Sequence, residues 1–166
     1  MGRFIRIVGP DHREPQQPVG PEVREKAWRE ALAINNAGPN ESRLSIVLQH
    51  RRMADQCAIE FCEWFRKQTD LLTKRGIELH IDTFDLSNNY IGDKGLASIA
   101  SMLRAASPRF LRVLKLHHNR ITDATPLLDI IASGKLAELH LSHNNLSARS
   151  IYKVLLAAVS AKHEGG

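Results

Sequence analysis

Three segments of the sequence can be aligned on one another, and this repetition constrains the fold more than any other feature. They begin at Ile81, Leu111 and Leu136 and read Ile-Asp-Thr-Phe-Asp-Leu-Ser-Asn-Asn-Tyr-Ile, Leu-Arg-Val-Leu-Lys-Leu-His-His-Asn-Arg-Ile and Leu-Ala-Glu-Leu-His-Leu-Ser-His-Asn-Asn-Leu. Each has apolar residues at positions 1, 4, 6 and 11 and asparagine at position 9. Because positions 4 and 6 lie on one side of a strand, parallel stacking of the three strands would bury them in one core.

The repeated asparagines, Asn89, Asn119 and Asn144, follow each predicted strand where the chain must turn. Their side-chain amides can hydrogen-bond backbone groups that the turn leaves without partners. The same side chain in successive repeats would therefore form a ladder, and we predict that these three residues are structural rather than catalytic.

A helical pattern follows each of the three predicted strands. Gly92 to Gly95 lead into Leu96, Ile99, Met102 and Leu103; Ala124 to Pro126 lead into Leu127, Leu128, Ile130 and Ile131; and Ser147 can cap a helix with Ile151, Val154, Leu155, Ala158 and Val159. Strand plus helix is thus the predicted repeat unit, one unit every 25 to 30 residues as judged from the asparagines.

This pattern resembles leucine-rich repeats of the ribonuclease-inhibitor-like class, whose units begin L-x-x-L-x-L-x-x-N-x-L and continue through a glycine-bearing turn to an α-helix. The resemblance covers about half of the chain, residues 81 to 159. It implies an α/β solenoid with a parallel concave sheet and outer helices. Pro126 stands where the turn glycine of the second, shortened repeat would be expected, so the geometry of that helix stays open.

The amino-terminal part divides by its prolines and turns. Residues 1–20 are rich in proline and predict an extended arm. In residues 21–76 we expect a helix from Pro21 to about Asn35, packing through Val23, Ala27, Ala31 and Ile34, and then a strand and a helix between Leu44 and Leu72. That strand and helix resemble a degenerate first repeat or a cap, with Trp64 covering the edge of the core. Residues 77–162 hold the repeats and 163–166 a frayed tail.

The resemblance implies that the concave sheet displays the residues between its buried positions to a protein partner. The displayed columns are Asp82, Arg112 and Ala137; Thr83, Val113 and Glu138; Asp85, Lys115 and His140; Ser87, His117 and Ser142; and Asn88, His118 and His143. From them we take Asp82, Thr83, Asp85, Ser87, Arg112, Lys115, His117, Glu138, His140 and Ser142 as candidate partner-binding residues. An acidic first strand beside a basic second one favours a charge-complementary interface, unless neighbouring opposite charges neutralise one another.

No pattern in the sequence names a catalytic residue, a cofactor or a metal. There is no G-x-S-x-G, phosphate loop or H-E-x-x-H motif, and no cysteine accompanies the histidines of the sheet. We expect histidine side chains at positions 5 and 7 to stand apart along the strands. Cys57 and Cys62 would be turned about 140° from each other on a helix, so we predict buried free thiols in a reducing compartment.

Charge and hydropathy limit the remaining classes. The net charge of +5 is spread over both halves of the chain, which makes direct, specific nucleic-acid binding an unfavoured hypothesis. No apolar run reaches the roughly 20 residues that span a bilayer, and no secretory signal is evident. The chain is expected to be intracellular and most simply cytoplasmic, with a mitochondrial or nuclear location also compatible.

Two functional hypotheses follow. The first is an adaptor that binds a protein partner through the concave face. The second is a small structural subunit of a larger assembly, which could contain RNA as a ribosome or mitochondrial ribosome does; the nearly uninterrupted apolar run from Leu155 to Val159 favours it because one side of the last helix needs a cover.

Overall fold

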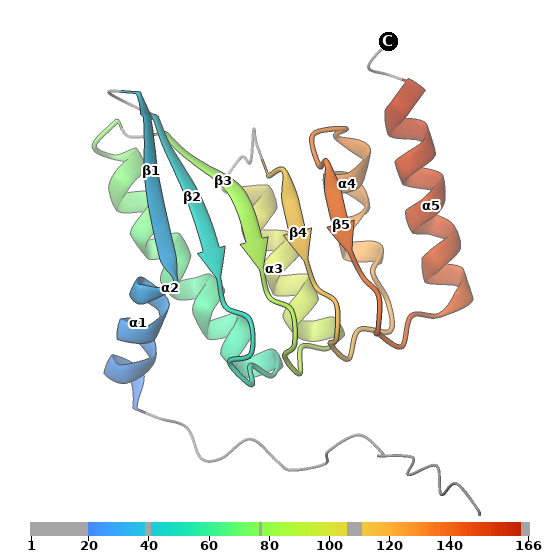
Figure 1. Cartoon of the computed structure of the whole chain (residues 1–166), viewed down its shortest axis with the longest axis horizontal. Coiled ribbons are helices and arrows are strands. Elements are labelled where there is room, and N and C mark those ends of the chain that lie inside the picture. The colour runs from blue at the N-terminus through green and yellow to red at the C-terminus, as the bar shows by residue number, and fades with distance from the viewer. Residues whose placement is uncertain (1–19, 39–40, 77, 106–110, 164–166) are drawn as a thin grey trace, which may run out of the picture.

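A computed structural model describes residues 20–38, 41–76, 78–105 and 111–163 of the chain (Figure 1). Its elements are α1 Pro21–Glu30, β1 Leu32–Gly38, β2 Glu41–Val47, α2 Asp55–Thr73, β3 Glu78–Asp85, α3 Asp93–Ala105, β4 Val113–Lys115, η1 Thr125–Leu127, α4 Leu128–Ala132, β5 Glu138–His140 and α5 Ala148–His163. All predictions for residues 1–19 and for the tail at 164–166 lie outside the described residues.

The strands form one sheet in the order β1-β2-β3-β4-β5. Strands β2 to β5 are parallel, and β1 joins the edge in the antiparallel direction. Helices α2 to α5 lie side by side along one face of this sheet (Figure 1). The predicted mixed α/β fold with a parallel sheet and helices on one side is therefore confirmed, although the sheet is small.

The three repeats stack in the predicted register. Phe84 of β3 pairs with Leu114 of β4, and Leu114 pairs with Leu139 of β5. The apolar positions of the first two repeats are almost completely buried, namely Ile81, Phe84, Leu86, Ile91, Leu111, Leu114, Leu116 and Ile121. Burial of each such side chain contributes about 1.5–3 kcal/mol, so this shared core is the main stabilising feature of the array.

Asparagine side chains connect successive turns. Asn119 accepts a hydrogen bond from the backbone N–H of Ile91 at 3.0 Å and donates to the carbonyls of Leu86 and Leu116 at 3.0 Å each. Asn144 repeats this arrangement one unit further on, with the N–H of Ile121 and the carbonyl of Leu116. Each asparagine thus satisfies polar groups of its own turn and of the preceding one.

The first unit of the sheet follows the same backbone pattern without an asparagine of its own. Ile46 of β2 pairs with Phe84, and the N–H of Leu48 donates to the Asp85 carbonyl as the N–H of Leu86 donates to that of Lys115. Asn89 of the next unit contacts this turn as Asn119 contacts the turn after β3, since its Oδ1 accepts the N–H groups of Arg51 and Met53. The strand and helix expected between Leu44 and Leu72 are both present.

The prediction of a helix from Pro21 to Asn35 is wrong beyond Glu30. The chain turns at Ala31 and forms β1, whose Leu32 and Ile34 lie opposite Ile46 and Leu44 of β2. Without β1, the outer edge of β2 would carry unpaired backbone groups, and pairing them outweighs a local helical pattern. The predicted apolar stripe is confirmed only in part, because Ala31 is buried, whereas Val23 and Ile34 are 58% and 56% exposed.

Aromatic side chains close the core at this end of the sheet. Trp28 of α1 packs edge-on against Phe61 of α2 with ring centroids 5.7 Å apart, and Trp64 lies 5.6 Å from Trp28. Phe61 in turn reaches Phe84 of the sheet at 5.9 Å. Trp64 is buried at the edge of the core, as expected, and α1 contacts α2 through its buried Trp28 and through the ion pair of Arg24 with Glu60.

The second repeat has the shortest helical segment among the described units. A 3-10 turn with Pro126 at its start leads into the five-residue helix α4. Proline fits a first helical turn but supplies no N–H, which agrees with the irregular start of this segment. Within the described residues, no helix combines the length and apolar character needed to cross a lipid bilayer.

Candidate protein-binding surface

The open face of the sheet is the side that α2 to α5 leave uncovered, and it presents the columns singled out in the sequence. The structure brings the candidates together on three adjacent strands and their turns, but their exposure differs. Arg112, Glu138 and Ser142 are exposed, whereas Asp82, Thr83, Lys115, His117 and His140 are half-buried.

The expectation that every column is displayed is wrong for Asp85 and Ser87. Asp85 Oδ1 accepts hydrogen bonds from the N–H and the hydroxyl of Ser87 at 3.0 and 2.6 Å, and both residues are buried. Lys115 Nζ lies 3.6 Å from the other carboxylate oxygen of Asp85. Asp85 and Ser87 therefore stabilise the turn and orient Lys115 rather than lie exposed on the surface. A direct contact of either residue with a partner stays a prediction.

Opposite charges on the open face pair within the chain. Besides Lys115 with Asp85, Arg112 Nε lies 3.3 Å from Asp82 and His140 Nε2 lies 3.1 Å from Glu138. Exposed pairs of this kind contribute about 0–1 kcal/mol each to stability. The sequence left two alternatives open: charges available to a partner, or neighbouring opposite charges that neutralise one another. At the centre of this face the charges neutralise one another.

Four histidines from β4, β5 and their turns form one cluster. His118 and His143 stack with ring centroids 4.0 Å apart, and His117 lies 5.6 Å from His118 and 6.0 Å from His140. The expectation that the position 5 and position 7 histidines stand apart is wrong, because the rings reach diagonally between neighbouring strands. In the part of the chain that the structure describes, no group of three or more His, Cys, Asp or Glu could hold a metal ion.

His117 is the most constrained member of the cluster. It is half-buried, and its Nδ1 is shielded from solvent without a hydrogen-bond partner among the described residues. Partial burial is the largest cause that lowers its pKa; the Asp85 carboxylate acts in the opposite direction, and His118, His140 and Lys115 lower the pKa further. The neutral imidazole is therefore favoured here.

A basic turn edge overlaps this cluster, and of its residues the sequence analysis had placed only His118 and His143 on the displayed face. We define it by exposed residues of the turns that follow β2, β4 and β5: His50, Arg51, Arg52, His118, Arg120 and His143. His50, His118 and His143 share a left-handed backbone with φ of 54° to 56°, as does Asn88 in the turn after β3, so these residues occupy equivalent points of the four turns. No ion pair joins the three arginines to a carboxylate among the residues described, and Arg120 instead lies over the ring of Tyr90 at 4.6 Å.

The signal for this edge was present in the repeats. Position 8 reads Asn, His and His, and position 10 reads Tyr, Arg and Asn, with no acidic residue at either position. Position 8 was already among the columns expected to be displayed, whereas position 10 and the turn after the first strand were not considered as part of a surface.

Comparison with known proteins agrees with the repeat geometry. Residues 79–100 match a family model described as Leucine Rich repeat. This stretch comprises nearly all of β3, the turn with Asn89 and the first half of α3, so the chain contains a leucine-rich repeat. Such repeats generally mediate protein–protein interaction. No curated protein and no solved structure gave a significant match to the chain.

Proposed function

We propose that this chain is a non-enzymatic protein-binding module whose repeats are of the ribonuclease-inhibitor-like class. The L-x-x-L-x-L-x-x-N-x-L pattern and the regular α-helices α3 and α5 behind the sheet support the class. Under this proposal the open face and the adjoining turn edge together contact one partner, and the fold supplies a rigid platform for them.

The observation that carries the proposal is the turn edge with its unpaired arginines. The cations at the centre of the open face are paired within the chain, whereas Arg51, Arg52 and Arg120 are exposed and have no carboxylate partner in the described residues. Surface arginines that are not already neutralised are available to form bidentate contacts with carboxylates. The proposed partner therefore presents an acidic surface, with the stacked His118 and His143 rings as a flat contact beside it.

The test begins with purification of tagged full-length chain from its native cells, with and without nuclease, followed by sizing of the associated proteins. The binding of each co-purified protein is then compared for Arg52→Glu/Arg120→Glu and the unchanged chain. We expect the double substitution to weaken binding by tenfold or more and added salt to do the same, because the contact is ionic.

A matched control variant changes the charge by the same amount on the helices that cover the other face of the sheet. Lys67 of α2 and Lys94 of α3 are exposed, so Lys67→Glu/Lys94→Glu shifts the net charge equally without touching the turn edge. Equal weakening by the two double variants, or none by either, would contradict the proposed surface.

A structural role in a larger assembly is the second candidate, and a separate observation favours it. Ile151, Tyr152, Leu155, Leu156 and Val159 of α5 are each 44–66% exposed, which is unusual for one side of a single helix. A stoichiometric, nuclease-resistant complex in the same purification would favour this candidate. Release of the chain by nuclease would indicate an RNA-containing assembly.

A further inference from the structure

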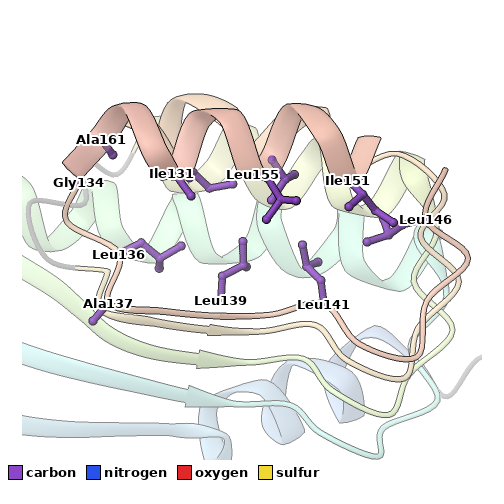
Figure 2. A pocket seen from close by; sticks show the side chains of 12 residues that line it. Ile131, Gly134, Leu136, Ala137, Leu139, Leu141, Leu146, Ile151, Leu155 and Ala161 are labelled. Carbon is purple, nitrogen blue, oxygen red and sulfur yellow. The ribbon is translucent and has the colours of Figure 1, made fainter. Parts of the chain in front are cut away.

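The array ends in an apolar groove between β5 and α5. Twelve residues line it, all of them aliphatic or glycine, and its volume is about 690 Å³. Figure 2 shows Leu139 and Leu141 pointing from the strand segment toward Leu155 and Ile151 of α5 across the groove. The groove shares only Ala137 with the displayed columns of the open face, and it shares no lining residue with the turn edge.

The groove exists because the third repeat has no successor in the described residues. Leu114, Leu116 and Ile121 of the second repeat are fully buried, whereas their equivalents Leu139, Leu141 and Leu146 are only half-buried. Side chains placed to form a core are therefore left in contact with solvent at this end.

The strand edge beside the groove also has a backbone donor without a hydrogen-bond acceptor among the described residues. The N–H of Leu86 donates to Lys115 and that of Leu116 donates to His140, each at 2.9 Å, but the equivalent N–H of Leu141 has no acceptor among the residues described. A free strand edge next to an apolar surface selects a polypeptide strand as its occupant, since a lipid or small apolar molecule would leave these donors unpaired.

A strand alone would not cover this end. Tyr152, Leu156 and Val159 lie further around α5 than the groove-lining Ile151 and Leu155, and Tyr152 and Val159 are 66% and 55% exposed. The occupant must therefore bring an apolar helix beside its strand edge. The same end of a second copy of this chain offers both.

We propose that two copies associate through this end around a two-fold axis at β5, with β5 antiparallel to its counterpart and α5 beside its counterpart. Side chains directly opposite each other must face the same side of a sheet, which restricts the register. Placing Leu139 opposite Leu139 of the second copy sets Glu138 opposite His140 of that copy, twice by symmetry. A register centred on Glu138 would oppose two carboxylates instead.

The charges of the strand support this register. Glu138 and His140 already form a 3.1 Å pair within one chain, and both lie on the open face where the two sheets would become continuous. In the dimer each carboxylate gains a second imidazole. The leucines and α5 supply the apolar contact, and the paired charges fix the alignment of the two copies.

Sedimentation equilibrium of the full chain over a hundredfold range of concentration tests the proposal. A reversible monomer–dimer equilibrium is expected, and Leu155→Glu/Leu156→Glu should weaken it by tenfold or more. Leu71→Glu is the matched control, because Leu71 is 55% exposed on α2, away from this end, and should leave the dimer unchanged. Circular dichroism verifies that each variant keeps its fold.

A charge exchange tests the register itself. Glu138→Lys should weaken the dimer by setting lysine opposite histidine, and Glu138→Lys/His140→Glu should restore it by opposing lysine and glutamate again. A monomer at every concentration would overturn the proposal, as would a dimer that ignores both the α5 and the charge variants. Slow amide exchange of Leu141 and Leu146 in a monomer, abolished on removal of residues 1–19, would assign the groove to the chain's own first segment and also overturn it.

Discussion

Asp55 at the start of α2 accepts a hydrogen bond on its Oδ1 from the backbone N–H of Gly95 in α3 at 3.0 Å. The same oxygen accepts the N–H of Gly92 at 2.6 Å. Asp93 repeats this arrangement one unit further, with the N–H groups of Thr122 and Asp123 at 2.8 and 3.0 Å. Aspartates at the helix starts therefore connect successive units on the side of the helices, as the asparagines connect the turns.

The close contact at Gly95 leads to the first prediction. A methyl group at this position would lie 2.7 Å from Asp55 Oδ1 and 2.9 Å from Ile91 Cγ2, so the structure must shift to admit it. Gly95→Ala should lower the free energy of unfolding by about 1–3 kcal/mol although alanine has the higher helix propensity. Urea unfolding measures the change. Gly20→Ala, with no atom within 4 Å of the added carbon, is the control, and an equal effect of both would contradict the prediction.

The sequence predicted the stacking of the repeats because the determining pattern is local and occurs three times. Apolar residues at fixed spacing define which side of each strand is buried, and Phe84, Leu114 and Leu139 indeed share one register. The role of Asp55 was not predictable in this way. An aspartate at a helix start is ordinary in any sequence, and its partner Gly95 is 40 residues away.

Two further differences have the same physical origin. The helix predicted to about Asn35 overlaps the first half of β1, but an unpaired edge of β2 exists only in the folded sheet, and residues 32–38 pair with it as β1. The histidine cluster likewise depends on how side chains lean between neighbouring strands, which spacing along the sequence does not contain. The candidate surface was therefore predicted by strand and column, whereas the ion pairs within it and the burial of its members required the structure.

The asparagine ladder gives the second prediction. Asn119 is buried and serves the N–H of Ile91 and the carbonyl of Leu86 in the preceding turn, so Asn119→Ala leaves buried polar groups unpaired. Each such group costs about 1–3 kcal/mol, and we expect a total loss of about 2–4 kcal/mol in the free energy of unfolding. Asn144 is half-buried at the open end, so Asn144→Ala should cost less, about 1–2 kcal/mol. If Asn119→Ala and Asn144→Ala lower the free energy of unfolding equally, burial does not determine how much each asparagine contributes to stability.

The two cysteines give the third prediction. Burial raises the pKa of the Cys62 thiol to about 12, and burial is also the largest cause of the raised pKa of Cys57. Because the thiolate is the reactive form, both cysteines should react slowly with iodoacetamide at pH 8 in the folded chain and at the ordinary rate in urea. Mass spectrometry of time points measures both sites. Rapid labelling of folded Cys62 would contradict the packing of α2.

The pH dependence of stability gives the fourth prediction, and its sign follows from His117. Because the folded-state pKa of His117 is lowered, the unfolded chain, with a histidine pKa of about 6.5, binds more protons between the two pKa values. The contribution of His117 is therefore fully present above about pH 7 and is lost as the pH falls through this window. The carboxyls of Asp93 and Asp123, whose pKa values are lowered in the folded chain, lose their contributions separately, below about pH 4.

Urea unfolding of the full chain at pH values from about 7.5 to 5 measures this dependence. His117→Asn should reduce the loss of stability between the two pKa values of His117, because the asparagine side chain does not titrate. His50→Asn removes an exposed imidazole from the first turn and controls for the loss of any one histidine. An unchanged pH profile in His117→Asn would show that the neutral state of this half-buried imidazole does not couple to folding.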